Sequence, residues 1–129
     1  MEIQRAVSPV GLTLVLSCAL LAQIPDKLPT SISLKEKTLL AAVTESAQWK
    51  PADPRVAQAY RELGDFYSSQ GRYGEAEKTY TKRLELAEDA LGRANPEIIT
   101  AVNDLARVNF AQMKYARTAE LFDRSLRIM

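Results

Sequence analysis

Apolar residues recur every three or four positions through most of the chain after residue 33, which is the spacing of one face of an α-helix. No stretch of this region shows the strict alternation that a half-buried strand would need. The apolar stripes consist of Val56, Tyr60, Leu63, Gly64 and Tyr67; of Tyr73, Ala76, Tyr80, Leu84, Ala87 and Leu91; of Ile98, Val102, Leu105 and Ala106; and of Tyr115, Phe122 and Leu126. The pattern predicts an all-α domain with four helices after residue 53.

Two segments, 54–91 and 96–129, carry the same pattern at an interval of 42 residues. The pairs that recur unchanged are Pro54/Pro96, Ala59/Ala101, Leu63/Leu105, Gln70/Gln112, Tyr73/Tyr115 and Leu84/Leu126. Each copy opens with a capping residue followed by proline, which suits the first turn of a helix. A fixed period of this size predicts a stacked array in which each unit buries its apolar face on the next.

A single helix is expected before the repeats. Ser33-Leu-Lys-Glu36 forms a capping box, so the helix should begin at Ser33 and run to about Trp49, where Pro51 stops it. Pro25 and Pro29 lie in the polar segment before it, which predicts a linker. The predicted organisation is a leader at 1–22, a linker at 23–32 and a helical domain at 33–129, made of one helix at 33–49 and repeats at 54–91 and 96–129.

The first 22 residues differ from the rest. Thirteen residues without charge, Val10–Ala22, follow Arg5 and the amino terminus. This length suits the core of a secretory signal and is short for a bilayer span of about 20 residues. Ser17 and Ala19 satisfy the small-x-small rule for cleavage, and Ala22 is a second option. We therefore expect export, to the periplasm, the cell envelope or the outside of a bacterium; the alternative is an uncleaved anchor over residues 6–22.

Cys18 has a second interpretation. Val15-Leu-Ser-Cys18 resembles the lipobox of bacterial lipoproteins, in which the cysteine becomes the lipidated first residue of the mature chain. Cys18 is therefore a candidate for lipidation, and otherwise a small residue of a discarded peptide. We expect contact with a membrane only through the signal or through such a lipid.

Composition excludes several functions. The chain has no histidine, one cysteine and a net charge of +1. Histidine, the commonest general base and metal ligand, is absent. One cysteine allows neither a disulfide framework nor a cysteine-based zinc site, and no clustered basic surface suggests nucleic-acid binding. The carboxylate pairs Glu75/Glu77 and Glu85/Glu88 have the spacing of exposed helix faces. We predict no enzyme activity, no cofactor and no metal site.

The residues of the repeat identify a resemblance. Tyr60-x-x-Leu63-Gly64-x-x-Tyr67, then Gln70-Gly71-Arg72-Tyr73-x-x-Ala76, then Tyr80 resembles a tetratricopeptide repeat. The segment from Ala90 to Pro96 is similar to the lengthened, 42-residue variant of kinesin light chains. The resemblance implies a tetratricopeptide-like α–α superhelix with two helix pairs plus one preceding helix.

The second repeat departs from this motif. Asn109 stands where Tyr67 stood, Met113 replaces the turn glycine Gly71, and Thr118 replaces Ala76. An unpaired polar group at position 109 would cost about 1–3 kcal/mol. We expect the second repeat to be the less stable of the two.

The resemblance implies a function. In such arrays the first helices line a concave groove that holds a peptide or a partner helix, so the protein is expected to be a non-catalytic interaction module with a protein or peptide partner. Arg61 and Arg107 favour the binding of acidic or amidated segments. Asn103 stands where an asparagine can bind a peptide backbone. The alternative is a solvated face without a ligand. The expected groove residues are Gln58, Arg61, Asp65, Ser68, Thr100, Asn103, Arg107 and Phe110.

Self-association is the other function left open. Leu121, Phe122, Leu126 and Ile128 are expected to leave an apolar face exposed on the last helix. The chain would then be a homo-oligomer through its C-terminal helix, or a subunit or fragment of a larger array without a separate ligand.

Overall fold

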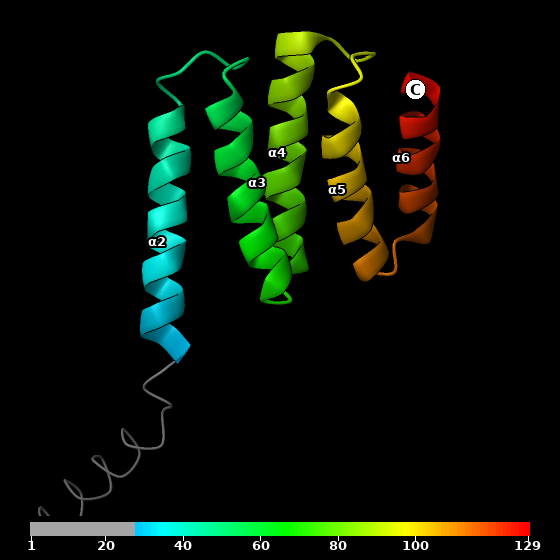
Figure 1. Ribbon diagram of the computed structural model, residues 1–129. Coiled ribbons are helices and arrows are strands. Elements are labelled where there is room, and N and C mark those ends of the chain that lie inside the picture. The colour runs from blue at the N-terminus through cyan, green and yellow to red at the C-terminus, as the bar shows by residue number, and fades with distance from the viewer. Residues whose placement is uncertain (1–27) are drawn as a thin grey trace, which may run out of the picture. The chain divides into compact units, whose positions relative to one another are not determined.

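The computed structural model of the chain describes residues 28–129 (Figure 1). Within these residues it has no strand, and its helices are α2 (Leu28–Ser46), α3 (Pro54–Ser69), α4 (Tyr73–Leu91), α5 (Ile98–Ala111) and α6 (Tyr115–Ile128). The all-α prediction is confirmed. The expected leader with Cys18, and the first part of the expected linker, lie outside the described residues. No described helix has both the length and the apolar character that crossing a membrane requires.

The chain divides into two compact units, one ending at Lys35 and the other comprising Glu36–Met129. The boundary falls inside α2, so the described part of the first unit is only the beginning of this helix. Both repeats belong to Glu36–Met129, and every contact discussed below lies within this unit.

The two repeats form two successive helix hairpins, α3 with α4 and α5 with α6 (Figure 1). Helix α4 also packs against α5, so it contributes to the cores of both hairpins. The buried apolar side chains of this core are Val56, Ala59, Leu63, Phe66, Tyr67, Ala76, Tyr80, Leu84, Ile98, Ala101, Val102, Leu105, Ala106, Val108 and Leu121. The predicted arrangement of two helix pairs and one preceding helix is confirmed.

Helix α2 differs from its predicted bounds at both ends. It begins at Leu28 rather than Ser33, since Pro29 falls in the first turn, where a missing N–H costs no hydrogen bond. The predicted capping box therefore lies inside the helix, and the last part of the expected linker is helical. The helix ends at Ser46, and the three following residues bond to carbonyls three positions earlier, the tighter turn typical of a helix end. Trp49 thus lies beyond the helix.

The capping residues before the two repeats, Asp53 and Asn95, differ in where the following helix begins. Oδ1 of Asp53 accepts a hydrogen bond of 2.9 Å from the amide of Arg55, and α3 begins at Pro54 as predicted. Oδ1 of Asn95 accepts an equivalent bond of 2.9 Å from Glu97. However, α5 begins only at Ile98, because the residues before it form a separate turn.

Ion pairs connect each hairpin to the helix that precedes it. The carboxylate of Glu36 in α2 accepts two hydrogen bonds of 3.0 Å from Arg72 and one of 3.1 Å from the hydroxyl of Tyr67. These hydrogen bonds lower the pKa of Glu36, and those from Arg72 have the largest effect. In the next repeat Lys114 donates a hydrogen bond of 2.7 Å to Glu77 of α4. Ion pairs therefore connect α2 to the first repeat and α4 to the second, and α4 in addition packs closely against α5.

Gly64 allows the helices of the first repeat to approach closely. A Cβ atom at this position would lie 2.5 Å from Cε1 of Tyr80, whose side chain is fully buried. In the second repeat Ala106 replaces the glycine, and the ring of Phe122 is 46% exposed. The absence of a side chain at position 64 therefore lets α3 and α4 pack closely in the first repeat.

The departures of the second repeat have structural consequences. The buried Asn109 donates a hydrogen bond of 2.9 Å from Nδ2 to the Leu105 carbonyl, but its Oδ1 has no partner among the described residues. Met113 adopts φ of +60°, close to the +71° of Gly71. This left-handed conformation is unfavourable for a residue with a side chain. Asn109 and Met113 therefore each place a local energetic cost in the second hairpin.

The apolar face of α6 is only partly as expected, since two of the four residues named, Phe122 and Leu126, are exposed. Leu121 was expected to be exposed, but it is buried, because it lies on the same side of the helix as the buried residues Thr118 and Ser125. Phe122 and Leu126 are exposed, the latter by 64%, and Ile128 is half-buried. Tyr115, two helical turns before Phe122, and Met129, three residues after Leu126, extend the exposed stripe.

Candidate functional site

The predicted groove residues lie on the first helices of the two repeats. Four are on α3 (Gln58, Arg61, Asp65 and Ser68) and four on α5 (Thr100, Asn103, Arg107 and Phe110). Ser68 is half-buried and the other side chains are exposed. Because α4 packs against both α3 and α5, it closes the space between them on one side.

A buried carboxylate, that of Asp104 on α5, is the centre of the site. Its Oδ2 accepts a hydrogen bond of 2.6 Å from Nη1 of Arg83 on α4, and its Oδ1 accepts one of 3.0 Å from Nη2 of Arg107. Nε of Arg61 on α3 lies 4.0 Å from Oδ2 of the same carboxylate. Side chains from three helices therefore converge on one acidic residue.

Asp65 provides the second negative charge. It lies 3.9 Å from Nε of Arg61 and 3.7 Å from Nη2 of Arg107, and it accepts a hydrogen bond from the hydroxyl of Tyr80. Burial, and then this bond to a carboxylate, raises the pKa of Tyr80. We call the residues Arg61, Arg83, Arg107, Asp65 and Asp104 the arginine cluster. With three cations and two anions, the cluster keeps one positive charge in excess.

The arginines of the cluster differ in accessibility. Arg83 is buried and also lies 3.4 Å from the hydroxyl of Thr100, whereas the side chains of Arg61 and Arg107 are 51% and 64% exposed. A guanidinium has five N–H donors, and the two exposed arginines use only part of theirs. The remaining donors suit a carboxylate, which can accept two parallel hydrogen bonds from one arginine. The cluster can therefore bind an acidic group while Arg83 continues to neutralise Asp104.

Other predicted residues lie apart from the cluster. Gln58 donates a hydrogen bond of 2.7 Å to Glu62, and the ring of Phe110 contacts that of Tyr115 with centroids 5.6 Å apart. Asn103 makes no side-chain hydrogen bond with any residue of the described part. The structure therefore brings together Arg61, Asp65 and Arg107, with Thr100 beside Arg83.

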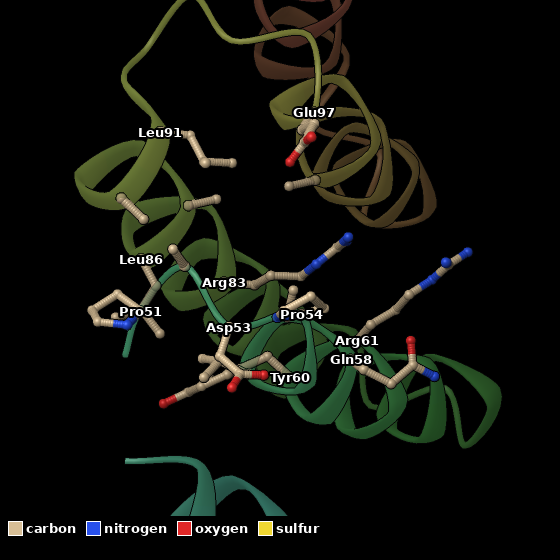
Figure 2. A pocket seen from close by; sticks show the side chains of 16 residues that line it. Pro51, Asp53, Pro54, Gln58, Tyr60, Arg61, Arg83, Leu86, Leu91 and Glu97 are labelled. Atoms are coloured by element: carbon tan, nitrogen blue, oxygen red, sulfur yellow. The ribbon is translucent and has the colours of Figure 1, made fainter. Parts of the chain in front are cut away.

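A pocket adjoins the arginine cluster between α3, α4 and α5 (Figure 2). We call it the groove pocket, and its volume is about 220 Å³. Figure 2 shows Leu91 and Glu97 at one end and Arg61 beside Gln58 at the other. Its apolar surface comes from Pro51, Pro54, Val56, Leu86, Ala87, Ala90 and Leu91. The pocket can receive one apolar side chain whose neighbour reaches the exposed arginine.

The sequence interpretation missed Arg83 and Asp104. It considered only the exposed faces of the first helices, whereas Arg83 belongs to a second helix and Asp104 to the face packed on α4. One signal was present: Glu62 and Asp104 are acidic residues 42 positions apart, each directly before a leucine of the predicted core stripe. Asp104 is buried whereas Glu62 is exposed, and a buried carboxylate requires a partner such as Arg83.

The carboxylates that we considered for catalysis mainly serve the fold. Glu75 is bound to Arg72, Glu77 to Lys114 and Glu88 to Arg124. Burial raises the pKa of Glu77, but the hydrogen bonds from Lys114 and Gln112 outweigh it, so the net shift is downward. Within residues 28–129 no three acidic or other metal-ligating side chains come close enough to hold an ion.

A family model described as tetratricopeptide repeat matches residues 55–129, which is more than half of the chain. No curated protein matches the sequence.

Proposed function

Since the chain belongs to the tetratricopeptide repeat family, whose repeats generally mediate protein–protein interactions, we propose that it binds an acidic peptide segment of a partner protein. The segment lies between α3 and α5, with a carboxylate on Arg61 and Arg107. The observation that carries this proposal is the excess positive charge of the arginine cluster, held on two exposed guanidiniums. The protein acts by holding this segment, without catalysis.

The groove pocket supports the proposal. It lies next to Arg61 and offers apolar surface from α4, so a bound segment gains affinity from a buried side chain as well as from the ion pair. The ion pair contributes orientation and specificity more than affinity, because both arginines are exposed to solvent.

Peptide arrays of acidic, neutral and basic sequences test this function. We expect acidic peptides to bind, and Arg61→Ala and Arg107→Ala each to weaken them several-fold, with a weaker interaction at high salt. Arg117→Ala is the matched control, because Arg117 is an exposed arginine of α6 paired with Glu120. Binding that survives both cluster variants would show that the segment lies elsewhere.

Export of the chain is a further part of the proposal. The apolar, uncharged segment Val10–Ala22 and the cysteine at position 18 support it. Mass spectrometry of the mature amino terminus distinguishes a chain cleaved after a small residue, a lipidated Cys18 and an uncleaved anchor. A full-length chain in the cytoplasmic fraction would contradict export.

Self-association is the second candidate function. Tyr115, Phe122 and Leu126 form an exposed apolar stripe on α6, and the exposed Met129 follows it. Native mass spectrometry or light scattering tests it, with Leu126→Glu as the disrupting variant. A monomer at all concentrations would exclude this candidate.

A further inference from the structure

A second pocket lies on the other side of α3, between this helix and the end of α2. Its residues are Ala42, Glu45, Trp49, Pro54, Arg55, Gln58, Ala59 and Glu62, and we call it the α2 pocket. Pro54 and Gln58 also line the groove pocket. The first turns of α3 therefore separate two neighbouring pockets.

The two pockets are related by the sequence repeat. Four positions that line the α2 pocket recur in the groove pocket 42 residues later: Glu45/Ala87, Trp49/Leu91, Arg55/Glu97 and Ala59/Ala101. The α2 pocket is therefore the equivalent of the groove pocket one repeat earlier. The lone helix α2 supplies the surface that α4 supplies to the groove pocket.

We infer that the α2 pocket is a second anchor site for the bound segment, and that it receives an apolar side chain next to a basic residue. This inference rests on the proposed function and adds to it a second apolar residue and a defined order of charges along the ligand. It also gives a role to α2, which has no partner helix of its own repeat within residues 28–129.

The charges around the α2 pocket determine the chemistry of its ligand. Glu45 and Glu62 border it, and neither forms an ion pair with a residue of the described part. Arg55 is also present, but Asp53 neutralises it through an ion pair of 2.7 Å. The pocket is therefore acidic, whereas the neighbouring arginine cluster is basic. A segment that fits both has a basic residue at its α2 end and an acidic residue at its α5 end.

Trp49 gives the α2 pocket a fixed apolar wall. The guanidinium of Arg55 lies 4.0 Å from the centre of the indole ring, a cation–π contact. Asp53 holds that guanidinium with hydrogen bonds of 3.0 Å from Nε and 2.7 Å from Nη2. The indole is therefore oriented before a ligand arrives, which reduces the entropy lost on binding.

Selection from a phage-displayed library of random short peptides on the full chain tests the inference. We expect the enriched peptides to contain two apolar positions, with a basic residue beside one and an acidic residue beside the other. An enriched peptide is then synthesised and its affinity is measured by fluorescence anisotropy. Trp49 is the only tryptophan of the chain, so a change in its emission on binding reports directly on the α2 pocket.

Matched alanine-to-leucine variants fill one pocket at a time. Ala42→Leu fills the α2 pocket, Ala90→Leu fills the groove pocket, and Ala116→Leu adds the same side chain at an exposed site on α6. We expect each of the first two variants to weaken binding about tenfold, as for the loss of one buried apolar side chain, and the third to have no effect. Circular dichroism confirms that each variant is folded. Glu45→Lys should reverse the preference for a basic residue.

The outcomes separate the inference from the proposed function. If Ala90→Leu and Arg61→Ala weaken binding while Ala42→Leu and Glu45→Lys do not, and Trp49 emission is unchanged, the second anchor is wrong and the proposed function stands. If no peptide is enriched, or none of these variants weakens binding, the proposed function fails and the inference fails with it. An enriched acidic residue beside the anchor of the α2 pocket would overturn the order of charges.

Discussion

Arg83 and Asp104 form a buried ion pair across the interface of α4 and α5, with 2.6 Å between Nη1 and Oδ2. The pair joins the two repeats, because Arg83 belongs to the first and Asp104 to the second. It also holds the carboxylate around which Arg61 and Arg107 gather. One interaction therefore supports both the packing of the repeats and the charge of the binding site.

Removal of Asp104 should destabilise the protein strongly. In Asp104→Ala the guanidinium of Arg83 stays buried without its counter-ion, which costs about 3–5 kcal/mol. Arg83→Met should cost less, since Asp104 keeps Arg107 as a partner. Asp123→Ala is the matched control, because Asp123 forms an exposed pair with Arg127 and should change stability by no more than about 1 kcal/mol. Urea unfolding followed by circular dichroism measures all three; equal losses for the two aspartates would contradict the assignment.

A methyl group at position 64 should also destabilise the first repeat. Gly64→Ala places a Cβ 2.5 Å from the ring of the buried Tyr80, so the helices must separate or the ring must move. Overpacking of this kind costs about 1–3 kcal/mol. Gly74→Ala is the control, since a Cβ there has no neighbour within 4 Å. We expect the control to be neutral or slightly stabilising; a neutral Gly64→Ala would show that the interface is loose.

Much of the fold could be predicted from the sequence, because its cause is local. The three-and-four spacing of apolar residues, the Asp53-Pro54 cap and the glycine at position 71 each act within a few residues. The predicted start of α2, Ser33, was wrong because two local signals compete. One is the capping box at Ser33, and the other is Pro29, which suits the first turn of a helix. Sequence does not decide which of two acceptable helix starts is used.

The site was less predictable, because its centre depends on contacts between distant residues. Arg61 and Arg107 were identified from the exposed faces of the first helices. Arg83 lies 21 positions before its partner Asp104, and neither belongs to those faces. Leu121 shows the same limit, since its burial depends on how α6 is rotated against α5. The periodic pattern therefore predicts where the helices lie in the sequence, whereas the packing between helices determines which of their residues are buried together.

Replacement of Met113 should stabilise the second repeat. Its φ of +60° costs an ordinary residue about 1–2 kcal/mol, and glycine adopts this conformation without that cost. The Met113 side chain is largely exposed, so little packing is lost. We expect Met113→Gly to raise the free energy of unfolding by about 1 kcal/mol, and Met113→Ala to give no gain. Thermal unfolding tests this, and a gain from alanine equal to that from glycine would refute the backbone explanation.

Acid should loosen α2 from the first repeat. The hydrogen bonds from Arg72 lower the pKa of Glu36 below its ordinary 4.5, so the ionised form stabilises the folded state. This contribution is complete above the ordinary value and is lost as the pH falls through the lowered one. We expect the protection factors of residues 36–46, that is, the exchange rates corrected for the pH dependence of intrinsic amide exchange, to fall below about pH 4.5. In Glu36→Gln exchange should already be faster at neutral pH. A difference between the two proteins that stays constant between about pH 6 and pH 3 would exclude this pair.

The unpartnered oxygen of Asn109 predicts a stabilising substitution. Its Oδ1 is buried without a hydrogen bond from any described residue, and such a group costs about 1–3 kcal/mol. In the first repeat the equivalent residue, Tyr67, donates a hydrogen bond from its hydroxyl to Glu36, whereas the amide oxygen of Asn109 can only accept one. Asn109→Leu removes the buried oxygen and keeps an apolar side chain in the core, so we expect the free energy of unfolding to rise by about 1 kcal/mol. Asn109→Asp, which buries a charge instead, should lower it. Denaturant unfolding of the three proteins decides the matter, since a leucine variant less stable than the asparagine protein would mean that Asn109 is satisfied in solution.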